Sequence, residues 1–323
     1  MTGTIAHTIA SQLGRSTIGA AISVAILGGV GYTLYELLRG IEPDKVLAAF
    51  ADQSAQELAA AGVFVAAAYV ALTFYDLFAL HTIGRHKVPY AVAALASFTS
   101  STIGHNLGAA VLTGGLIRLR IYSVWGLTVT DVAKIAVLTG ITFWLGNALL
   151  LGGATAYIPE AASTVDHLPS WLNRAIGLAG LLGIGCYLLW LAPTPRAIGR
   201  SGWRIVLPNF RFTLLQIGIG AIDLILVTLA MYTLLPATPA VSLPNVMVVF
   251  LAATLLGTVS HAPAGLGVIE ATMLVGLPQY PREALLAALL TFRALYFLLP
   301  LFLATASLGI RELRVLTRAA KSR

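Results

Sequence analysis

The sequence predicts an all-α polytopic membrane protein, and three observations support this fold class. Hydrophobic residues make up 58% of the 323 positions, whereas charged residues make up only 10%. The mean hydropathy is +0.87, well above that of soluble domains of this size. Apolar runs of about 20 residues recur, and no charged stretch is long enough to form a separate soluble domain. Residues 1–323 are therefore interpreted as one membrane domain.

Six apolar runs are long enough to cross a bilayer once. They cover residues 17–38, 57–80, 130–154, 173–191, 212–235 and 283–308. The first run is too long for the core of a signal peptide and lacks a small-x-small cleavage pattern, so we expect it to remain as a signal anchor. The single cysteine, Cys186, lies within the fourth run, which excludes disulfides and cysteine-rich metal sites.

Two further apolar runs, 91–117 and 246–277, have small and polar residues at their centres. These centres read "SFTSSTIGHNLG" and "LLGTVSHAPAGLG". If both runs crossed the membrane once, the basic loops before and after the first of them would lie on opposite faces, against the positive-inside tendency. Two half-helices of about 12 residues, each about 18 Å long, would instead enter and return near the mid-plane. We therefore predict two re-entrant helical hairpins.

This topology places the basic loops and both termini in the cytoplasm. The exceptions among the 20 Lys and Arg residues are Arg39, Lys45, Arg174, Arg282 and Arg293. The net charge of +7 is thus explained by orientation in the membrane, and no nucleic-acid partner is expected.

Glycine and proline mark where each predicted hairpin reverses. Gly104 and Gly108 are expected to break the first hairpin. Pro263, Gly265 and Gly267 are expected to break the second. Irregular backbone at that depth requires surrounding protein or a wet cavity. The alternative for each run is a single long, kinked helix whose polar side chains are satisfied.

The chain contains an internal repeat of span, hairpin and span, over residues 57–155 and 212–309. Aligning "STIGHNLGAA" with "GTVSHAPAGL" pairs His105 with His261. The flanking spans then match at three further positions, Asp76 with Asp223, Asp131 with Glu283 and Thr139 with Thr291. Because the two copies enter from opposite sides, they form an inverted repeat, which points to a transport site between the halves.

Ionisable groups within the apolar runs are expensive, and each needs a partner or water. The candidates are Asp76, Asp223, Glu270, Arg293, His105 and His261. Arg293 could pair with Glu270 or with Asp223, and a purely structural role stays open for each residue.

Polar residues close to the first hairpin are also candidates. Arg118 and Arg120 are expected at its cytoplasmic mouth, where they either snorkel or hold a lipid phosphate through forked hydrogen bonds. Asn106 serves either as a packing hydrogen bond or as a polar lining. No metalloprotease, nucleophile-elbow or P-loop motif is present, so the sequence predicts neither an enzyme nor a cofactor.

The stretches "FTSSTIGHNLGAAVLTGGLIRLRIYS" and "SHAPAGLGVIEA" resemble the flippase domain of the lysylphosphatidylglycerol synthase/flippase family, the multiple peptide resistance factor proteins. The similarity covers nearly the whole chain. It implies an inner-membrane flippase that moves an anionic or aminoacylated phosphatidylglycerol-type lipid. That family also has a cytosolic synthase domain, which does not follow here, so the resemblance implies translocation without synthesis. Ala264 stands where the family often has glycine.

The resemblance implies functional roles for Asp76, the tip from Gly104 to Asn106, Arg118, the tip from His261 to Glu270, and Arg293. The expected partners are a phospholipid substrate, a separate lipid-modifying synthase and a second copy of the chain. Two alternatives stay open: an ion-coupled carrier of a small polar solute, using Asp76, Asp223 and Glu270, and a scaffold that assembles with a synthase. A groove open to lipid favours the flippase, a sealed cavity the carrier and a dry core the scaffold.

Overall fold

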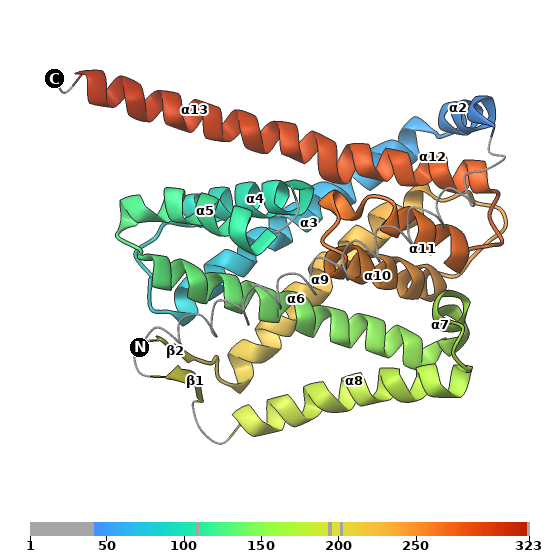
Figure 1. The fold of residues 1–323 in the computed structure, drawn as a ribbon, viewed down its shortest axis with the longest axis horizontal. Helices are drawn as coiled ribbons and strands as arrows, with labels where there is room; N and C mark the ends of the chain where they lie inside the picture. Colours follow the sequence, from blue (N-terminus) through green and yellow to red (C-terminus); the bar gives the residue numbers. More distant parts are fainter. Residues whose placement is uncertain (1–41, 108–109, 193–195, 201–202, 322–323) are drawn as a thin grey trace, which may run out of the picture.

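The structure, a computed structural model, describes residues 42–107, 110–192, 196–200 and 203–321. Five helices in this part are long and apolar enough to cross a membrane. They run side by side and form the body of the molecule (Figure 1). The prediction of an all-α polytopic membrane protein is therefore confirmed.

Five of the six predicted spans correspond to these helices. They are α3 (Ala55–Thr82), α6 (Val129–Tyr157), α8 (Ser170–Leu191), α9 (Phe210–Leu234) and the continuous segment of α12 (Arg282–Arg293), η3 (Ala294–Leu298) and α13 (Leu299–Lys321). The predicted span at 17–38 lies outside the described residues. Local sequence explains two of the starts, because Ser54 with Glu57 and Thr128 with Asp131 form capping boxes.

Apolar side chains cover the outer surface of the spans as well as the core. Leu182 on α8 is 69% exposed and Leu189 is 72% exposed. Such a surface is typical of helices that face lipid, since water would make it unfavourable.

The centre of the bundle is the pair α3 and α9, which pack against each other along their lengths. Helix α6 crosses α9 at Gly220, where an added Cβ would lie 2.4 Å from the carbonyl oxygen of Thr142. Only glycine permits this approach of the two backbones. One apolar cluster surrounds Met231, Phe250 and Met273, and a second surrounds Leu80 and Ile135.

The first predicted hairpin consists of α4 (Tyr90–Leu107) and α5 (Ala110–Tyr122), which pack against each other. The single-helix alternative is therefore wrong for this run. The expected break at Gly104 is also wrong, because α4 continues through it to Leu107. Gly108 lies outside the described residues. Helices α4 and α5 approach closely at Gly114, whose added Cβ would lie 3.0 Å from the carbonyl oxygen of Ser100.

The polar centre of α4 is used for helix packing. Ser97 donates a hydrogen bond to the carbonyl oxygen of Leu72 on α3, at 2.8 Å. Thr99 and Ser100 donate to backbone carbonyls of their own helix. These hydroxyls therefore satisfy their polar needs locally and let α4 lie close to α3.

The second predicted hairpin consists of α10 (Leu243–Val259), the short turn η2 (Pro263–Gly265) and α11 (Val268–Gly276). Its break is confirmed where the sequence placed it. Gly265 and Gly267 have φ angles of 62° and 79°, which glycine adopts without cost. His261 and Ala264 also have positive φ, and these strain their backbones. Helices α10 and α11 pack against each other, so this run too is a hairpin.

The two hairpins occupy opposite halves of the molecule, and their closed ends meet near its middle (Figure 1). Helix α4 contacts η2 at this meeting point. Helix α10 contacts α6, and α4 contacts α13, which is the exchange of neighbours that an inverted repeat requires.

Several short elements were not predicted. They are α2 (Pro43–Ala51), η1 (Ser123–Trp125), α7 (Pro159–Asp166) and the antiparallel strands β1 (Ala197–Arg200) and β2 (Trp203–Val206). The last span also changes to π-helical geometry over η3. Such π-turns occur most often at functional sites. They make the segment next to the hairpin tips irregular.

Candidate functional site

The predicted ionisable residues form two separate buried ion pairs, one in each half of the molecule. Asp76 pairs with Arg118, and Glu270 pairs with Arg293. Asp223 belongs to neither ion pair and accepts a hydrogen bond from a tyrosine. The structure thus answers which carboxylate pairs with Arg293: it is Glu270.

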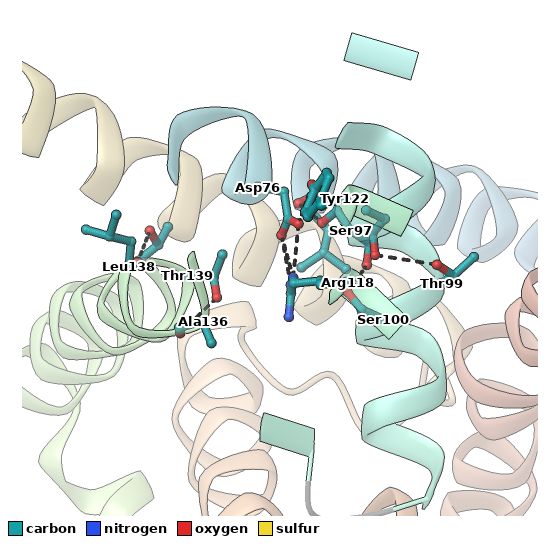
Figure 2. Close-up of polar contacts among 12 residues, drawn as sticks. Asp76, Ser97, Thr99, Ser100, Arg118, Tyr122, Ala136, Leu138 and Thr139 are labelled. Atoms are coloured by element: carbon teal, nitrogen blue, oxygen red, sulfur yellow. Dashed lines mark hydrogen bonds and ion pairs between the residues drawn. The ribbon is translucent and has the colours of Figure 1, made fainter. Parts of the chain in front are cut away.

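The first pair links α3 to α5, and both carboxylate oxygens of Asp76 accept hydrogen bonds. Asp76 is fully buried, and the Nε and Nη2 atoms of Arg118 donate to its two carboxylate oxygens at 2.8 to 3.1 Å. Tyr122, one turn further along α5, donates its hydroxyl to the same carboxylate at 2.7 Å. Figure 2 shows the three side chains converging between the two helices.

This geometry corrects the expected position of Arg118. Its side chain is 9% exposed, and its fork is directed at Asp76. Arg118 therefore does not line an open mouth of the hairpin. Leaving the buried carboxylate of Asp76 without its partner would cost more free energy than losing a contact to a phosphate. Arg120, two residues away and on the other face of α5, is exposed.

Asp223 lies on α9 at the central contact with α3. The hydroxyl of Tyr75 donates to its Oδ2 atom at 2.9 Å. The residue is 5% exposed. Asp223 forms no ion pair within the described residues, so the tyrosine hydroxyl compensates only partly for the burial of its carboxylate.

The second ion pair lies at the broken tip of the second hairpin. Arg293 ends α12, its Nε atom donates to Glu270, and its Nη1 atom donates to the carbonyl oxygen of Ala264 at 3.0 Å. Glu270 also accepts from the backbone N–H of Gly267 at 2.8 Å, which caps α11. The Nη2 atom of Arg293 is buried and has no hydrogen-bond partner.

The tip of the first hairpin reaches the same place. The side-chain amide of Asn106 donates to the carbonyl oxygen of Phe297 in η3 at 3.3 Å, and the ring of Phe297 lies 5.5 Å from the Arg293 guanidinium. Tyr69 on α3 donates to the carbonyl oxygen of Tyr296 at 2.9 Å. Thr102 is fully buried, and its hydroxyl has no partner. We call Tyr69, Thr102, Asn106, Glu270, Arg293 and Phe297 the tip cluster.

The remaining predicted site residues have less specific surroundings. Gly104 is buried within α4. His105 is exposed on α4, and His261 is exposed with its Nδ1 atom 2.8 Å from the carbonyl oxygen of Val259. Neither histidine forms a hydrogen bond or ion pair with the tip cluster. No group of three metal-ligating side chains occurs within the described residues.

The tip cluster contains hydrogen-bond donors that are not used within the described residues. It combines a buried guanidinium N–H and a buried hydroxyl that lack partners with the broken backbone of the second hairpin. Unsatisfied buried donors are costly, so each of them favours the binding of an acceptor. A phosphate or carbonyl oxygen is the acceptor that a guanidinium binds best.

Sequence reasoning missed the aromatic members of these sites. Tyr122 follows Arg118 by four residues, which places both on one face of a helix and was a usable signal. Pro300 follows η3 and removes a backbone donor, which signals an irregular helix nearby. Tyr69 and Tyr75 carry no such signal, because their partners come from distant helices.

Two known proteins are similar to this chain over most of its length. The uncharacterized protein slr0712 of Synechocystis is 32% identical over 304 residues, which cover 94% of this chain and 92% of that protein. The inner membrane protein YbhN of Escherichia coli is 31% identical over 253 residues, which cover 76% of this chain and 77% of YbhN. No family model matches the chain.

Proposed function

The chain belongs to the family of the inner membrane protein YbhN, and from this premise we propose that it is a phospholipid translocase of the inner membrane. Its substrate in this proposal is an anionic or aminoacylated phosphatidylglycerol-type lipid. The lipid changes leaflet without any change in its covalent bonds.

One observation carries the proposal: the buried Nη2 atom of Arg293 has no acceptor, at the point where both hairpin tips meet. Moving a charged head group through hydrocarbon is strongly unfavourable. A guanidinium fixed near the middle of the bundle lowers that cost because it offers a donor to the phosphate. Glu270 holds the guanidinium in place, while its own charge keeps the empty site close to neutral.

The broken tips supply the other half of the argument. Backbone carbonyls and N–H groups of 261–267 are not all used within helices, so they can exchange partners with a passing head group. The acyl chains would stay in the surrounding lipid, next to the exposed leucines and valines of the spans.

A second function is favoured by one specific observation. Asp223 is a buried carboxylate that accepts a hydrogen bond from a tyrosine hydroxyl. Buried carboxylates of this type bind protons or cations in coupled carriers. An ion-coupled carrier of a small polar solute is therefore the alternative, and a coupling ion would also supply energy for lipid movement.

The proposal includes an orientation, with both termini and the loop containing Arg85 and Lys87 in the cytoplasm. In a Cys186→Ser background, single cysteines at Lys87 and Ser123 would flank the first hairpin. Both are expected to react with an impermeant maleimide only from the cytoplasmic side. Reaction from opposite sides would show that this hairpin crosses the membrane.

The function is tested with purified protein in liposomes that contain a panel of head-group-labelled phospholipids. We expect faster leaflet exchange of phosphatidylglycerol-type lipids than in protein-free liposomes, with zwitterionic lipids as the comparison. Protein-free rates for every lipid would overturn the proposal. Proton-driven uptake of a polar solute under the same conditions would favour the alternative.

A further inference from the structure

The β1–β2 hairpin connects two membrane-capable helices. They are α8, which ends at Leu191, and α9, which begins at Phe210. Each strand has four residues and is about 13 Å long at about 3.3 Å per residue, so the hairpin cannot extend far from the ends of these spans. It lies at the end of the bundle opposite α7 and α2 (Figure 1).

One face of the hairpin is anchored to the bundle. Ile205 is 3% exposed and packs into the apolar cluster that contains Leu80 and Val132. The N–H of Leu207 donates to the carbonyl oxygen of Arg196 at 2.7 Å, which closes the base of the hairpin. These contacts fix its orientation.

The opposite face of the hairpin carries both a basic and an apolar side chain. Because successive side chains alternate along a strand, Arg204 and Val206 point away from buried Ile205. Val206 is 54% exposed and Arg204 is exposed. Their cross-strand partners are Gly199 and Ala197, which are too small to cover them.

The start of α9 follows the hairpin in the chain and adds a second basic and apolar pair. Arg211 is exposed, and Phe212 next to it is 51% exposed. Within the described part of the chain, neither Arg204 nor Arg211 has an ion-pair partner. The sequence contains no Asp or Glu between Asp166 and Asp223, so the five arginines in this segment have no acidic neighbours in the sequence.

From this geometry we infer that the outward face of the β1–β2 hairpin and the start of α9, comprising Arg204, Val206, Arg211 and Phe212, bind anionic phospholipid head groups of the adjacent leaflet. The guanidinium groups contact phosphates, and Val206 with Phe212 enter the acyl boundary. This occupant fits because the surface lies where two spans leave the bilayer and carries the opposite charge. The inference goes beyond translocation and holds whether or not the chain moves lipid.

The test uses the full chain in a neutral detergent, titrated with phosphatidylglycerol or phosphatidylcholine. Amide hydrogen exchange of a peptide covering 196–208 reports binding at the hairpin itself. Phosphatidylglycerol should protect this peptide at lower concentration than phosphatidylcholine. Replacing both arginines, Arg204→Gln with Arg211→Gln, should raise the half-saturating concentration by about 5-fold for each arginine removed.

The matched control is Arg174→Gln, an exposed arginine at the opposite end of the bundle, which should leave the titration unchanged. Equal protection by the two lipids, or an unchanged titration in the double variant, would overturn the inference. Protection by inorganic phosphate alone would also overturn it, because the site would then take a free anion. A loss of leaflet exchange in Arg293→Gln with normal protection of 196–208 would leave this inference intact and test the translocase separately.

Discussion

The two buried ion pairs are alike in composition and differ in completeness. Asp76 receives two nitrogens of Arg118 and a tyrosine hydroxyl, and no buried nitrogen of that arginine lacks a partner. Arg293 binds Glu270 and one carbonyl oxygen, yet its Nη2 atom is buried and unsatisfied. A saturated pair fixes two helices to each other, whereas an incomplete pair next to broken backbone is available to a ligand.

The backbone around the two ion pairs also differs, because it is regular around the first pair and irregular around the second. Asp76 and Arg118 lie between the regular helices α3 and α5. Glu270 and Arg293 lie beside η2 and η3, where the backbone is irregular. An intramembrane charge alone therefore does not identify a binding site, and its unused hydrogen-bonding capacity is the more informative property.

The largest expected effect is on the stability of the first pair. Asp76→Ala leaves the guanidinium of Arg118 buried without its partner, which should lower the free energy of unfolding by about 3–5 kcal/mol. Thermal unfolding in detergent measures this. Asp52→Ala, which removes an exposed carboxylate, should change stability by no more than about 0.5 kcal/mol. Similar stability of the two variants would contradict a clamping role for Asp76.

The next prediction neutralises both members of each pair. Glu270→Gln with Arg293→Gln should lower the rate of leaflet exchange at least about 10-fold, the factor that corresponds to 1.4 kcal/mol, because it removes the donor for the head group. Asp76→Asn with Arg118→Gln should leave the rate per folded molecule within about 2-fold, since that pair is structural.

Rates in liposomes and thermal unfolding of both double variants decide the comparison. A fully active Glu270→Gln, Arg293→Gln protein would show that the second pair is also structural. The single variant Glu270→Gln adds a check. It should lose leaflet exchange but remain folded, because Arg293 still donates to the carbonyl oxygen of Ala264 and α11 keeps its own helical hydrogen bonds.

A smaller effect is expected from the backbone of the second tip. Gly265→Ala places a Cβ 2.8 Å from Ile269 at a residue with φ of 62°, which should cost about 1–2 kcal/mol of stability. Gly115→Ala, in the interior of α5 with nothing within 4 Å of the added Cβ, should be neutral or stabilising by up to about 1 kcal/mol. Thermal unfolding of the two variants would show the same change if the tip were an ordinary helix.

The sequence was sufficient for the five spans within the described residues and for the broken second hairpin, and the reasons are local. The composition and length of an apolar run determine whether it can enter the membrane. Pro263, Gly265 and Gly267 together prevent a regular helix at the tip of the second hairpin. The break at Gly104 was wrong because glycine inside a helix is tolerated when close packing against a neighbour compensates. The strands β1 and β2 were missed because they are four residues long.

The pairing of charges was predicted only in part, because it depends on contacts between distant helices. Arg293 was expected to bind Glu270 or Asp223, and only packing selects Glu270. Arg118 was expected at an open mouth, but Asp76 is 42 residues away and comes to it through the fold of α3 against the first hairpin. Whether an atom such as Nη2 of Arg293 has a hydrogen-bond partner depends on the folded structure, so no sequence pattern predicts it.

The smallest expected effect compares two tyrosines that each donate to a buried aspartate. Tyr122→Phe should cost about 1 kcal/mol of stability, because Asp76 keeps both nitrogens of Arg118. Tyr75→Phe removes the hydroxyl that donates to Asp223, and a hydrogen bond to a charged carboxylate is worth about 1.5–3 kcal/mol. Thermal unfolding of Tyr75→Phe at neutral pH therefore reports the charge of Asp223, with Tyr122→Phe as the comparison. A loss of about 1.5–3 kcal/mol means that Asp223 is ionised in the folded protein and needs its donor. A loss of only about 1 kcal/mol would mean that Asp223 is already neutral, because a neutral acceptor gains no more than that from the hydroxyl. A neutral Asp223 would contradict the expected difference and would strengthen the ion-coupled alternative, because a carboxyl group that holds a proton inside the bundle can also release it.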